Sequence, residues 1–311
     1  MIQKTQTSYA GPMQPYSGLE RWERQVALPS GITLHVYDTG GLDKPPVVLL
    51  HGLGDEADTW RRVLPLLAED YRAIAPDLPG FGRSDKPDRS YTVPFFAATM
   101  LELLDRLAVP RAVLVGHSTG AIIAHHFALE HSERVARLVL IGGSLVSKRQ
   151  PVNLSLLLFL VPGLGERLYT RLRKDPQAAY RTLAPYYHQL DDLPKADRDF
   201  LFRRVNERVW SDGQRKGYFS TLRNLARWLP GRQKDLPARL ENWTVPTVAI
   251  WGEDDRVNPI DNAHALAAAL PAARLVLVPR AGHNVQQEQP EIVAAAVTRP
   301  ESLQPTPPDA R

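Results

Sequence analysis

Short apolar runs alternate along the chain with longer segments whose apolar positions recur at helical spacing. Runs such as VVLL, AVLV and LVLI are apolar at successive positions, which is typical of strands buried on both faces of a parallel sheet. The predicted strands are Thr33–Tyr37, Val47–Leu50, Arg72–Ala75, Ala112–Val115, Leu138–Ile141, Thr247–Trp251 and Leu275–Val278. The predicted helices are Trp60–Glu69, Val93–Leu107, Thr119–Glu130, Asn262–Ala269 and Pro290–Val297. This alternation predicts an α/β fold with a mostly parallel central sheet flanked by helices.

The alternation stops between Ile141 and Val245, where no strand-like run occurs. Prolines divide this stretch into short helical patterns, and a structureless loop of such length is uncommon in a compact domain. We therefore predict an inserted, all-helical subdomain. The last residues contain four prolines, which favour a disordered tail. The predicted division is a first core part at 20–146, the helical insert at 147–243, a second core part at 244–298 and the tail at 299–311.

The composition is that of a globular chain, since 43% of the 311 residues are apolar and 23% are charged. The chain has no cysteine, which excludes disulfides, cysteine-ligated zinc, iron–sulfur clusters and thiol catalysis. The N-terminus lacks the apolar run of a secretory signal, so we expect a cytoplasmic location. The most apolar stretch, Leu154–Leu164, is about half the roughly 20 residues that span a membrane. We expect it to form a buried or interfacial helix, without stable membrane insertion.

The net charge of +4 is unevenly distributed. Between Lys148 and Asn242 there are 19 Lys and Arg against 10 Asp and Glu, a net charge of +9. No nucleic-acid recognition motif accompanies these cations, so we expect no nucleic-acid partner. Most of them are expected on a solvated face, where their long stems cover apolar surface. We expect a small-molecule substrate and a monomer or homodimer.

The strongest chemical signal is the segment Gly116-His117-Ser118-Thr119-Gly120, which has the form G-x-S-x-G. It lies between a predicted strand and a predicted helix, as in a nucleophile elbow, the tight turn that presents a serine hydroxyl above the sheet. Side chains at Gly116 and Gly120 would collide with the flanking strand and helix. The first N–H groups of the helix point toward charge that develops beside the serine. These features predict that Ser118 is a nucleophile.

A serine nucleophile needs a base, and the base needs an acid that orients it. Asp254 and Asp255 follow the predicted strand Thr247–Trp251, and His283 follows the last predicted strand. Open α/β sheets place their sites just beyond the carboxyl ends of strands, where these residues lie. The chain therefore carries a serine, an acid and a histidine in the order found in α/β-hydrolases.

Together these motifs resemble the α/β-hydrolase fold family with an inserted helical cap, over about Val47 to Glu291. The resemblance implies that the triad acid is Asp255, three residues after the glycine of the acid loop. The segment His51-Gly52-Leu53-Gly54 is similar to the family's oxyanion-loop motif. This implies that the backbone N–H groups of Leu53 and Thr119 form an oxyanion hole. The motif positions expected to support the site are His51, Gly52, Gly54, Gly116, His117 and Gly120.

The resemblance implies a serine hydrolase that needs no cofactor. Dehalogenases and epoxide hydrolases of this fold use an aspartate where this chain has Ser118, so a serine implies acyl transfer through an acyl-enzyme. We expect hydrolysis of a carboxylic ester of a small to medium, partly apolar substrate, as in carboxylesterases and lipases. Lactonase, amidase and perhydrolase chemistry are alternatives. A non-catalytic small-molecule binder is less favoured, because all three triad positions are filled.

Hydrolases that cleave a C–C bond in a vinylogous diketone, of the meta-cleavage-product type, are a further alternative. The chain resembles them at Gly282-His283, Gln286 and Glu288, which match G-H-x-x-Q-x-E. It departs from them at Gln287, where they typically have Trp, and at Asp55-Glu56, where Pro-Gly is expected. Their substrates carry a carboxylate, which the positive charge of the helical insert would suit.

No metal or nucleotide site is expected. The residues His125, His126, Glu130 and His131 lack the spacing of zinc-protease ligands and lie on the helix behind the nucleophile. Neither G-x-G-x-x-G nor G-x-x-x-x-G-K-[ST] occurs in the chain.

Overall fold

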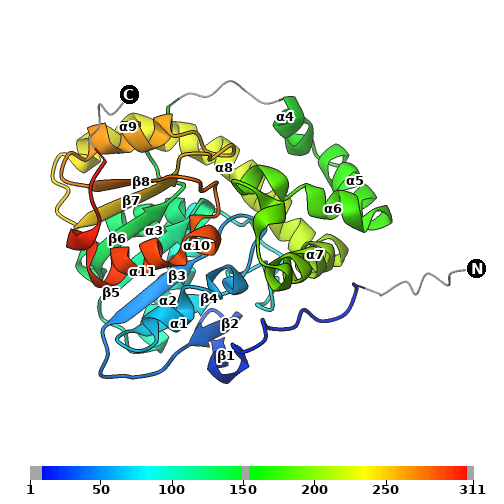
Figure 1. Cartoon of the computed structure of the whole chain (residues 1–311), viewed down its shortest axis with the longest axis horizontal. Coiled ribbons are helices and arrows are strands. Elements are labelled where there is room, and N and C mark those ends of the chain that lie inside the picture. The colour runs from blue at the N-terminus through cyan, green and yellow to red at the C-terminus, as the bar shows by residue number, and fades with distance from the viewer. Residues whose placement is uncertain (1–8, 149–153, 307–311) are drawn as a thin grey trace, which may run out of the picture.

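The computed structural model describes residues 9–148 and 154–306, and its centre is an eight-stranded sheet (Figure 1). The strands are β1 (Glu23–Ala27), β2 (Thr33–Asp38), β3 (Pro46–Leu50), β4 (Arg72–Pro76), β5 (Ala112–His117), β6 (Val135–Ile141), β7 (Thr247–Gly252) and β8 (Arg274–Val278). Their order across the sheet is β1-β2-β4-β3-β5-β6-β7-β8. The pairs β1–β2 and β2–β4 are antiparallel, and every later pair is parallel. The predicted α/β fold is confirmed.

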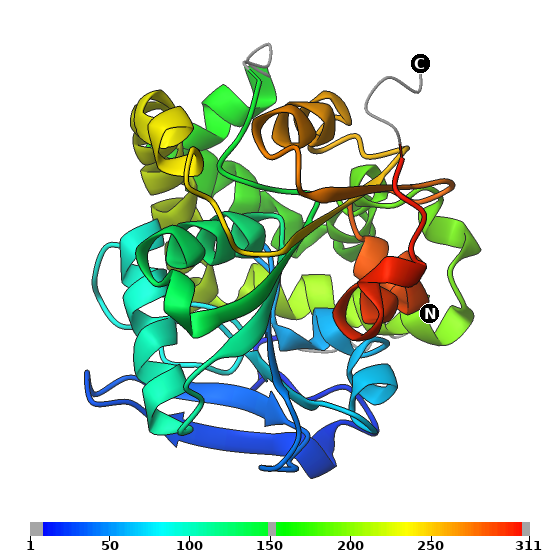
Figure 2. The same ribbon diagram turned by 90° about the vertical axis from the view of Figure 1, so that its left-hand side faces the viewer.

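Helices cover both faces of the sheet (Figure 2). The helices are α1 (Leu64–Leu67), α2 (Val93–Arg106), α3 (Thr119–Glu130), α4 (Leu154–Leu160), α5 (Leu164–Arg171), α6 (Pro176–Arg181), α7 (Lys195–Trp210), α8 (Asp212–Leu240), α9 (Asp261–Ala269), α10 (Val285–Glu288) and α11 (Pro290–Thr298). One face packs against α2, α3, α9 and the end of α8, and the other packs against α1, α10 and α11. The central strands are therefore buried on both sides, as their continuous apolar runs predict.

Between β6 and β7 the described residues form helices, α4 to α8, and no strand. We call this segment the helical insert. Figure 1 shows α5, α6 and α7 to one side of the sheet, while α8 extends back over it. The insert is not built only from short helices, because α8 continues through Pro230 and Pro237. Both prolines are exposed.

Besides the short helix α10, which was not predicted, three parts of the chain outside the insert differ from the prediction. The pattern does not predict β1, because its sequence ERQVA is mostly polar, as suits an exposed strand with a single neighbour at the sheet edge. The predicted helix Trp60–Glu69 is instead the 3-10 turn Ala57–Trp60 followed by α1, with Pro65 in the first helical turn. The predicted disordered tail is wrong for residues 299–306, where the Thr306 N–H donates to the Leu275 carbonyl at 2.8 Å. Residues 307–311 lie outside the described residues.

Candidate active site

Ser118 occupies a strained turn between β5 and α3. Its backbone angles are φ 53° and ψ −116°, in a region that few residues other than glycine adopt. Close packing imposes this turn. A Cβ atom at Gly116 would lie 2.4 Å from the Gly120 carbonyl oxygen, and one at Gly120 would lie 2.3 Å from the Leu50 carbonyl oxygen. The collisions expected from the sequence are therefore present, and they leave the Ser118 side chain at the carboxyl end of β5.

The side chains predicted to act as base and acid lie in hydrogen-bonding contact. His283 Nδ1 lies 2.8 Å from Asp255 Oδ2, and both side chains are buried. The other oxygen, Oδ1, accepts the backbone N–H groups of Val257 at 2.9 Å and Asn258 at 2.7 Å. Since the carboxylate accepts the Nδ1 hydrogen, Nε2 carries the lone pair of His283. Nε2 is buried and has no hydrogen-bond partner within residues 9–148 and 154–306.

Asp254, the competing acid, points elsewhere. Its Oδ2 lies 2.7 Å from Nδ1 of His188, which belongs to the helical insert. The geometry therefore pairs the histidine after β8 with Asp255 and not with Asp254.

Ser118 and His283 line one cavity of about 310 Å³. Its core side also includes Gly52, Leu53, Gly54 and His117. Aromatic and aliphatic side chains of the insert line the opposite side, among them Phe159, Tyr169, Leu183, Val205, Val209 and Tyr218. Such a cavity suits a small, partly apolar molecule held above a few polar groups.

Hydrogen bonds orient the loop after β3. His51 is fully buried, and its Nε2 accepts the Leu78 N–H at 2.9 Å. The hydrogen is therefore on Nδ1, which donates to the Gly52 carbonyl oxygen at 2.8 Å. Burial lowers the pKa of His51, which keeps the ring neutral for these two bonds. Because the peptide group is planar and trans, the Leu53 N–H points away from the carbonyl of Gly52.

The second predicted oxyanion donor, Thr119, is the first residue of α3, where backbone N–H groups have no partner within the helix. His117 lies beside it and is buried, with Nε2 donating to the His283 carbonyl oxygen at 3.0 Å. Burial and the neighbouring His283 lower the pKa of His117 to about 3, so its ring stays neutral. The oxyanion roles of Leu53 and Thr119 stay predictions that this geometry supports.

The two motif residues shared with C–C hydrolases tie loops together. The Glu288 carboxylate accepts the N–H of Gly282 and the N–H of His188, each at 2.8 Å. Gln286 donates to the Thr59 hydroxyl at 3.0 Å. Neither side chain lines the cavity. Their match to G-H-x-x-Q-x-E therefore concerns the placement of the His283 loop rather than substrate contact.

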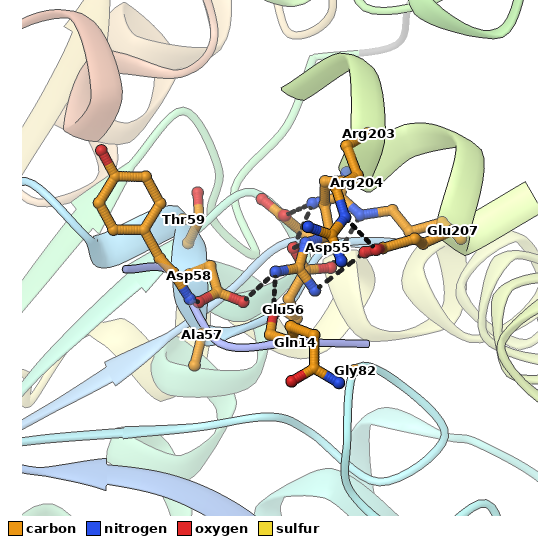
Figure 3. A network of polar contacts seen from close by, with 12 residues as sticks. Gln14, Asp55, Glu56, Ala57, Asp58, Thr59, Gly82, Arg203, Arg204 and Glu207 are labelled. Carbon is orange, nitrogen blue, oxygen red and sulfur yellow. Dashed lines mark hydrogen bonds and ion pairs between the residues drawn. The ribbon is translucent and has the colours of Figure 1, made fainter. Parts of the chain in front are cut away.

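An ion pair in the cavity wall is the feature that the sequence does not reveal. Arg208 of α7 donates through Nη2 to Asp55, and through Nε to Glu56 Oε2 at 2.8 Å. Asp55 and Arg208 both line the cavity. Burial alone would raise the pKa of Asp55, yet the Arg208 guanidinium outweighs burial and holds that pKa below its usual value. Arg204, one turn earlier, pairs with Glu56 and Asp58 in the same network (Figure 3).

In the described part of the chain, no group of three His, Asp or Glu side chains is arranged so that it could hold a metal ion. His125 packs against Trp243 and His126 against Trp228, with ring centroids 5.3 and 5.2 Å apart. Within the same residues, no helix is long and apolar enough to cross a bilayer.

Comparison with known proteins agrees with this geometry. The family model described as alpha/beta hydrolase fold matches residues 45–290. The 2-hydroxy-6-oxo-6-phenylhexa-2,4-dienoate hydrolase of Burkholderia cepacia is 31% identical over 268 residues, which cover 83% of this chain and 87% of that protein. The 2-hydroxy-6-oxononadienedioate/2-hydroxy-6-oxononatrienedioate hydrolase of Cupriavidus pinatubonensis is 31% identical over 269 residues, which cover 82% and 86%.

Solved structures show the same similarity. Wild-type Cfl2 from Burkholderia cenocepacia has a TM-score of 0.76 at 27% identity, covering 91% of this chain and 95% of that one. A mutant of the meta-cleavage product hydrolase CumD has a TM-score of 0.71 at 25% identity, covering 88% and 96%. The chain belongs to the α/β-hydrolase fold family, and its relatives include hydrolases of small molecules.

Proposed function

We propose that this chain is a serine hydrolase in which Ser118 is the nucleophile, His283 the base and Asp255 the acid that orients the base. The observation that carries the proposal is the buried His283–Asp255 pair, which leaves Nε2 of His283 unpaired, together with the place of His283 and Ser118 in the lining of one cavity. A serine hydroxyl is a weak nucleophile until such a base accepts its proton.

The proposed reaction begins when the Ser118 hydroxyl oxygen bonds to a substrate carbonyl carbon and His283 Nε2 takes the hydroxyl proton. The N–H groups of Leu53 and Thr119 stabilise the resulting oxyanion. The bond to the leaving group then breaks, and the leaving atom receives the proton from His283. Water attacks the acyl-enzyme in the same way, with His283 as base, and releases the acid and Ser118.

The leading substrate class is a 2-hydroxy-6-oxo-dienoate, in which the leaving atom is carbon. Two relatives named for such substrates match this chain at 31% identity over most of both lengths. They favour C–C cleavage over the ester hydrolysis expected from the nucleophile motif. A partly apolar cavity with one polar end is compatible with a substrate of this shape.

Ester hydrolysis is the second candidate, and one observation favours it. Arg208 is the one Lys or Arg among the described residues that line the cavity, and it is already bonded to Asp55 and Glu56. A dienoate carboxylate would have to share this guanidinium with two carboxylates, whereas a neutral ester would not.

Turnover of two substrates tests both candidates. We expect wild type to hydrolyse 2-hydroxy-6-oxo-6-phenylhexa-2,4-dienoate with a kcat/KM at least about tenfold above its kcat/KM for p-nitrophenyl butyrate. We expect Ser118→Ala, with an unchanged melting temperature, to lose at least about 10³-fold in kcat on either compound. The reverse order of kcat/KM would select the ester reading. Unchanged turnover in Ser118→Ala would exclude Ser118 as the nucleophile.

A further inference from the structure

Exposed apolar side chains gather on α4 and at the start of α5. Of the large apolar side chains exposed in the described residues, the four that lie close together in the chain are Leu157, Leu158, Val161 and Leu164, which are 44, 41, 47 and 37% exposed. We call these four residues the apolar ridge. Figure 1 shows α4 and α5 on the outer rim of the insert, away from the sheet. Single exposed apolar residues are ordinary, but a group of them marks a binding surface.

Cations lie next to the apolar ridge. Arg167 and Arg171 are exposed on α5, four residues apart and thus on one side of the helix, and Lys174 follows in the next turn. These three cations share one surface depression with Arg215 of α8. The connection between α4 and α5 is held to α8 by Arg223, which donates to the Leu160 carbonyl oxygen at 3.1 Å.

Most carboxylates of this region already have ion-pair partners. The exception is the exposed Asp88, which lines the same depression as Lys216 and Arg227 and forms no ion pair within the described residues. Glu166 forms its ion pair with Arg223, and Asp212 forms ion pairs with Arg173 and Arg215. By contrast, no ion pair within the described residues involves the exposed cations of the region, Arg167, Arg171, Lys174, Lys216 and Arg227. The surface around the apolar ridge therefore carries uncompensated positive charge.

We propose that the apolar ridge and these five cations form a docking surface for an anionic lipid bilayer, on which the chain lies without crossing it. Apolar side chains flanked by Lys and Arg are the composition of segments that lie in the bilayer interface, where anionic headgroups attract the cations. The ridge lies outside the active-site cavity, so the proposal does not depend on the proposed reaction.

Two other partners, a second copy of this chain and single-stranded nucleic acid, fit this surface less well than an anionic bilayer. A second copy of this chain, related by two-fold symmetry, would place the same cations against each other. Single-stranded nucleic acid would satisfy the cations, but it binds through aromatic side chains on which bases stack, and the ridge has none.

The position of α4 gives docking a consequence for substrate access. Phe159 follows Leu158 and lines the cavity, and its ring also stacks on that of Phe219, with centroids 5.8 Å apart. The short helix α4 thus carries two residues of the apolar ridge, Leu157 and Leu158, and also Phe159 of the cavity wall. An apolar molecule dissolved in the bilayer would meet the chain beside its cavity.

Vesicle sedimentation of the full chain tests the proposal. We expect wild type to sediment with vesicles of phosphatidylglycerol and phosphatidylcholine in equal parts at low salt, and to be released at about 1 M salt. Vesicles of phosphatidylcholine alone should not retain it. Arg167→Gln/Arg171→Gln should lower the partition coefficient about 25-fold, since each cation near an anionic surface contributes about fivefold. Leu157→Ser/Leu158→Ser should lower it by at least about tenfold.

Two control variants match these changes elsewhere on the surface. Arg106→Gln/Arg299→Gln removes two exposed cations from α2 and from the residue after α11, and Leu42→Ser removes an exposed leucine from the β2–β3 loop. Both should bind vesicles within about twofold of wild type. Absence of binding to anionic vesicles, or equal losses in test and control variants, would overturn the proposal. So would a concentration-dependent dimer in sedimentation velocity that Leu157→Ser/Leu158→Ser abolishes, because it would assign the ridge to a second copy.

Discussion

Asp254 and Asp255 are neighbours in one loop but have different partners. Hydrogen bonds to the loop backbone determine which of the two carboxylates faces His283. Two backbone N–H groups hold one oxygen of Asp255, so that its other oxygen faces His283. Asp254 instead reaches the helical insert, where it meets His188. The two side chains are identical in type and adjacent in sequence, which makes each the natural control for the other.

We expect Asp255→Asn to lower kcat/KM by about 10³- to 10⁴-fold, because an amide neither stabilises the imidazolium nor selects the tautomer with Nδ1 protonated. Asp254→Asn leaves the bonds of Asp255 in place and should change kcat/KM by less than about threefold, as expected for a half-exposed pair. Steady-state rates on the substrate that wild type turns over fastest measure both. Similar losses in the two variants would contradict the assignment of the acid.

Glycines set how closely the elements around Ser118 pack. Gly116 and Gly120 let α3 cross the ends of β5 and β3 at distances that a methyl group would prevent. For Gly231, in the second half of α8, the position that a Cβ would take has no described atom within 4 Å apart from its chain neighbours and the nearby backbone of the same helix. Replacing glycine by alanine is therefore expected to change the free energy of unfolding in opposite directions at Gly120 and at Gly231.

We expect Gly120→Ala to destabilise the chain by about 1–3 kcal/mol, because the added methyl forces the backbone of α3 away from β3. Gly231→Ala should stabilise it by up to about 1 kcal/mol, since alanine loses less backbone entropy in a helix. Urea unfolding of both variants beside wild type gives the two differences in free energy. A destabilised Gly231→Ala variant, or a Gly120→Ala variant as stable as wild type, would refute this reading of the packing.

Seven of the eight strands follow from the sequence, because strands buried on both faces need a continuous apolar run. The missing strand, β1, has no such requirement at the exposed edge. The helix through Pro230 was not predictable from local preference, since its stability comes from packing against the core. The Ser118, Asp255 and His283 positions follow from motifs because each lies just past a strand. The Asp55–Arg208 pair could not be predicted from the sequence, because 153 positions separate its members and only the docking of the insert brings them together.

Where α7 of the insert packs against the loop after β3, the contact is a network of charged side chains rather than an apolar interface. In Figure 3, Arg203, Arg204 and Glu207 of α7 lie above Asp55, Glu56 and Asp58 of the loop after β3. Arg204 is almost fully buried against those carboxylates, and Arg208 closes the network at the cavity. The loop that carries Leu53 is thereby connected to a helix that is distant in sequence.

We expect Arg208→Gln to lower the free energy of unfolding by about 3–5 kcal/mol, because it leaves Asp55 without its ion-pair partner and the buried Glu56 with Arg204 alone. Its kcat/KM should also fall, since Asp55 lies two residues from the Leu53 N–H. Arg203→Gln is the matched control on the same helix. Its side chain is 60% exposed and pairs with Glu207 one turn away, so it should cost less than about 0.5 kcal/mol. Urea unfolding and steady-state rates measure both variants, and a tolerated Arg208→Gln would show that the network does not hold the loop.

The division of the cavity between core and insert has a consequence for how such a chain diverges during evolution. The residues proposed to react lie at strand ends of the core, whereas most of the apolar wall that faces them comes from the insert. Mutation can therefore reshape the wall, and with it the range of molecules admitted, without touching the reacting groups. Descendants of one ancestor can therefore keep the same reacting groups and act on different compounds. Arg208 is the exception, because it belongs to the insert and is bonded to the core loop that carries Leu53.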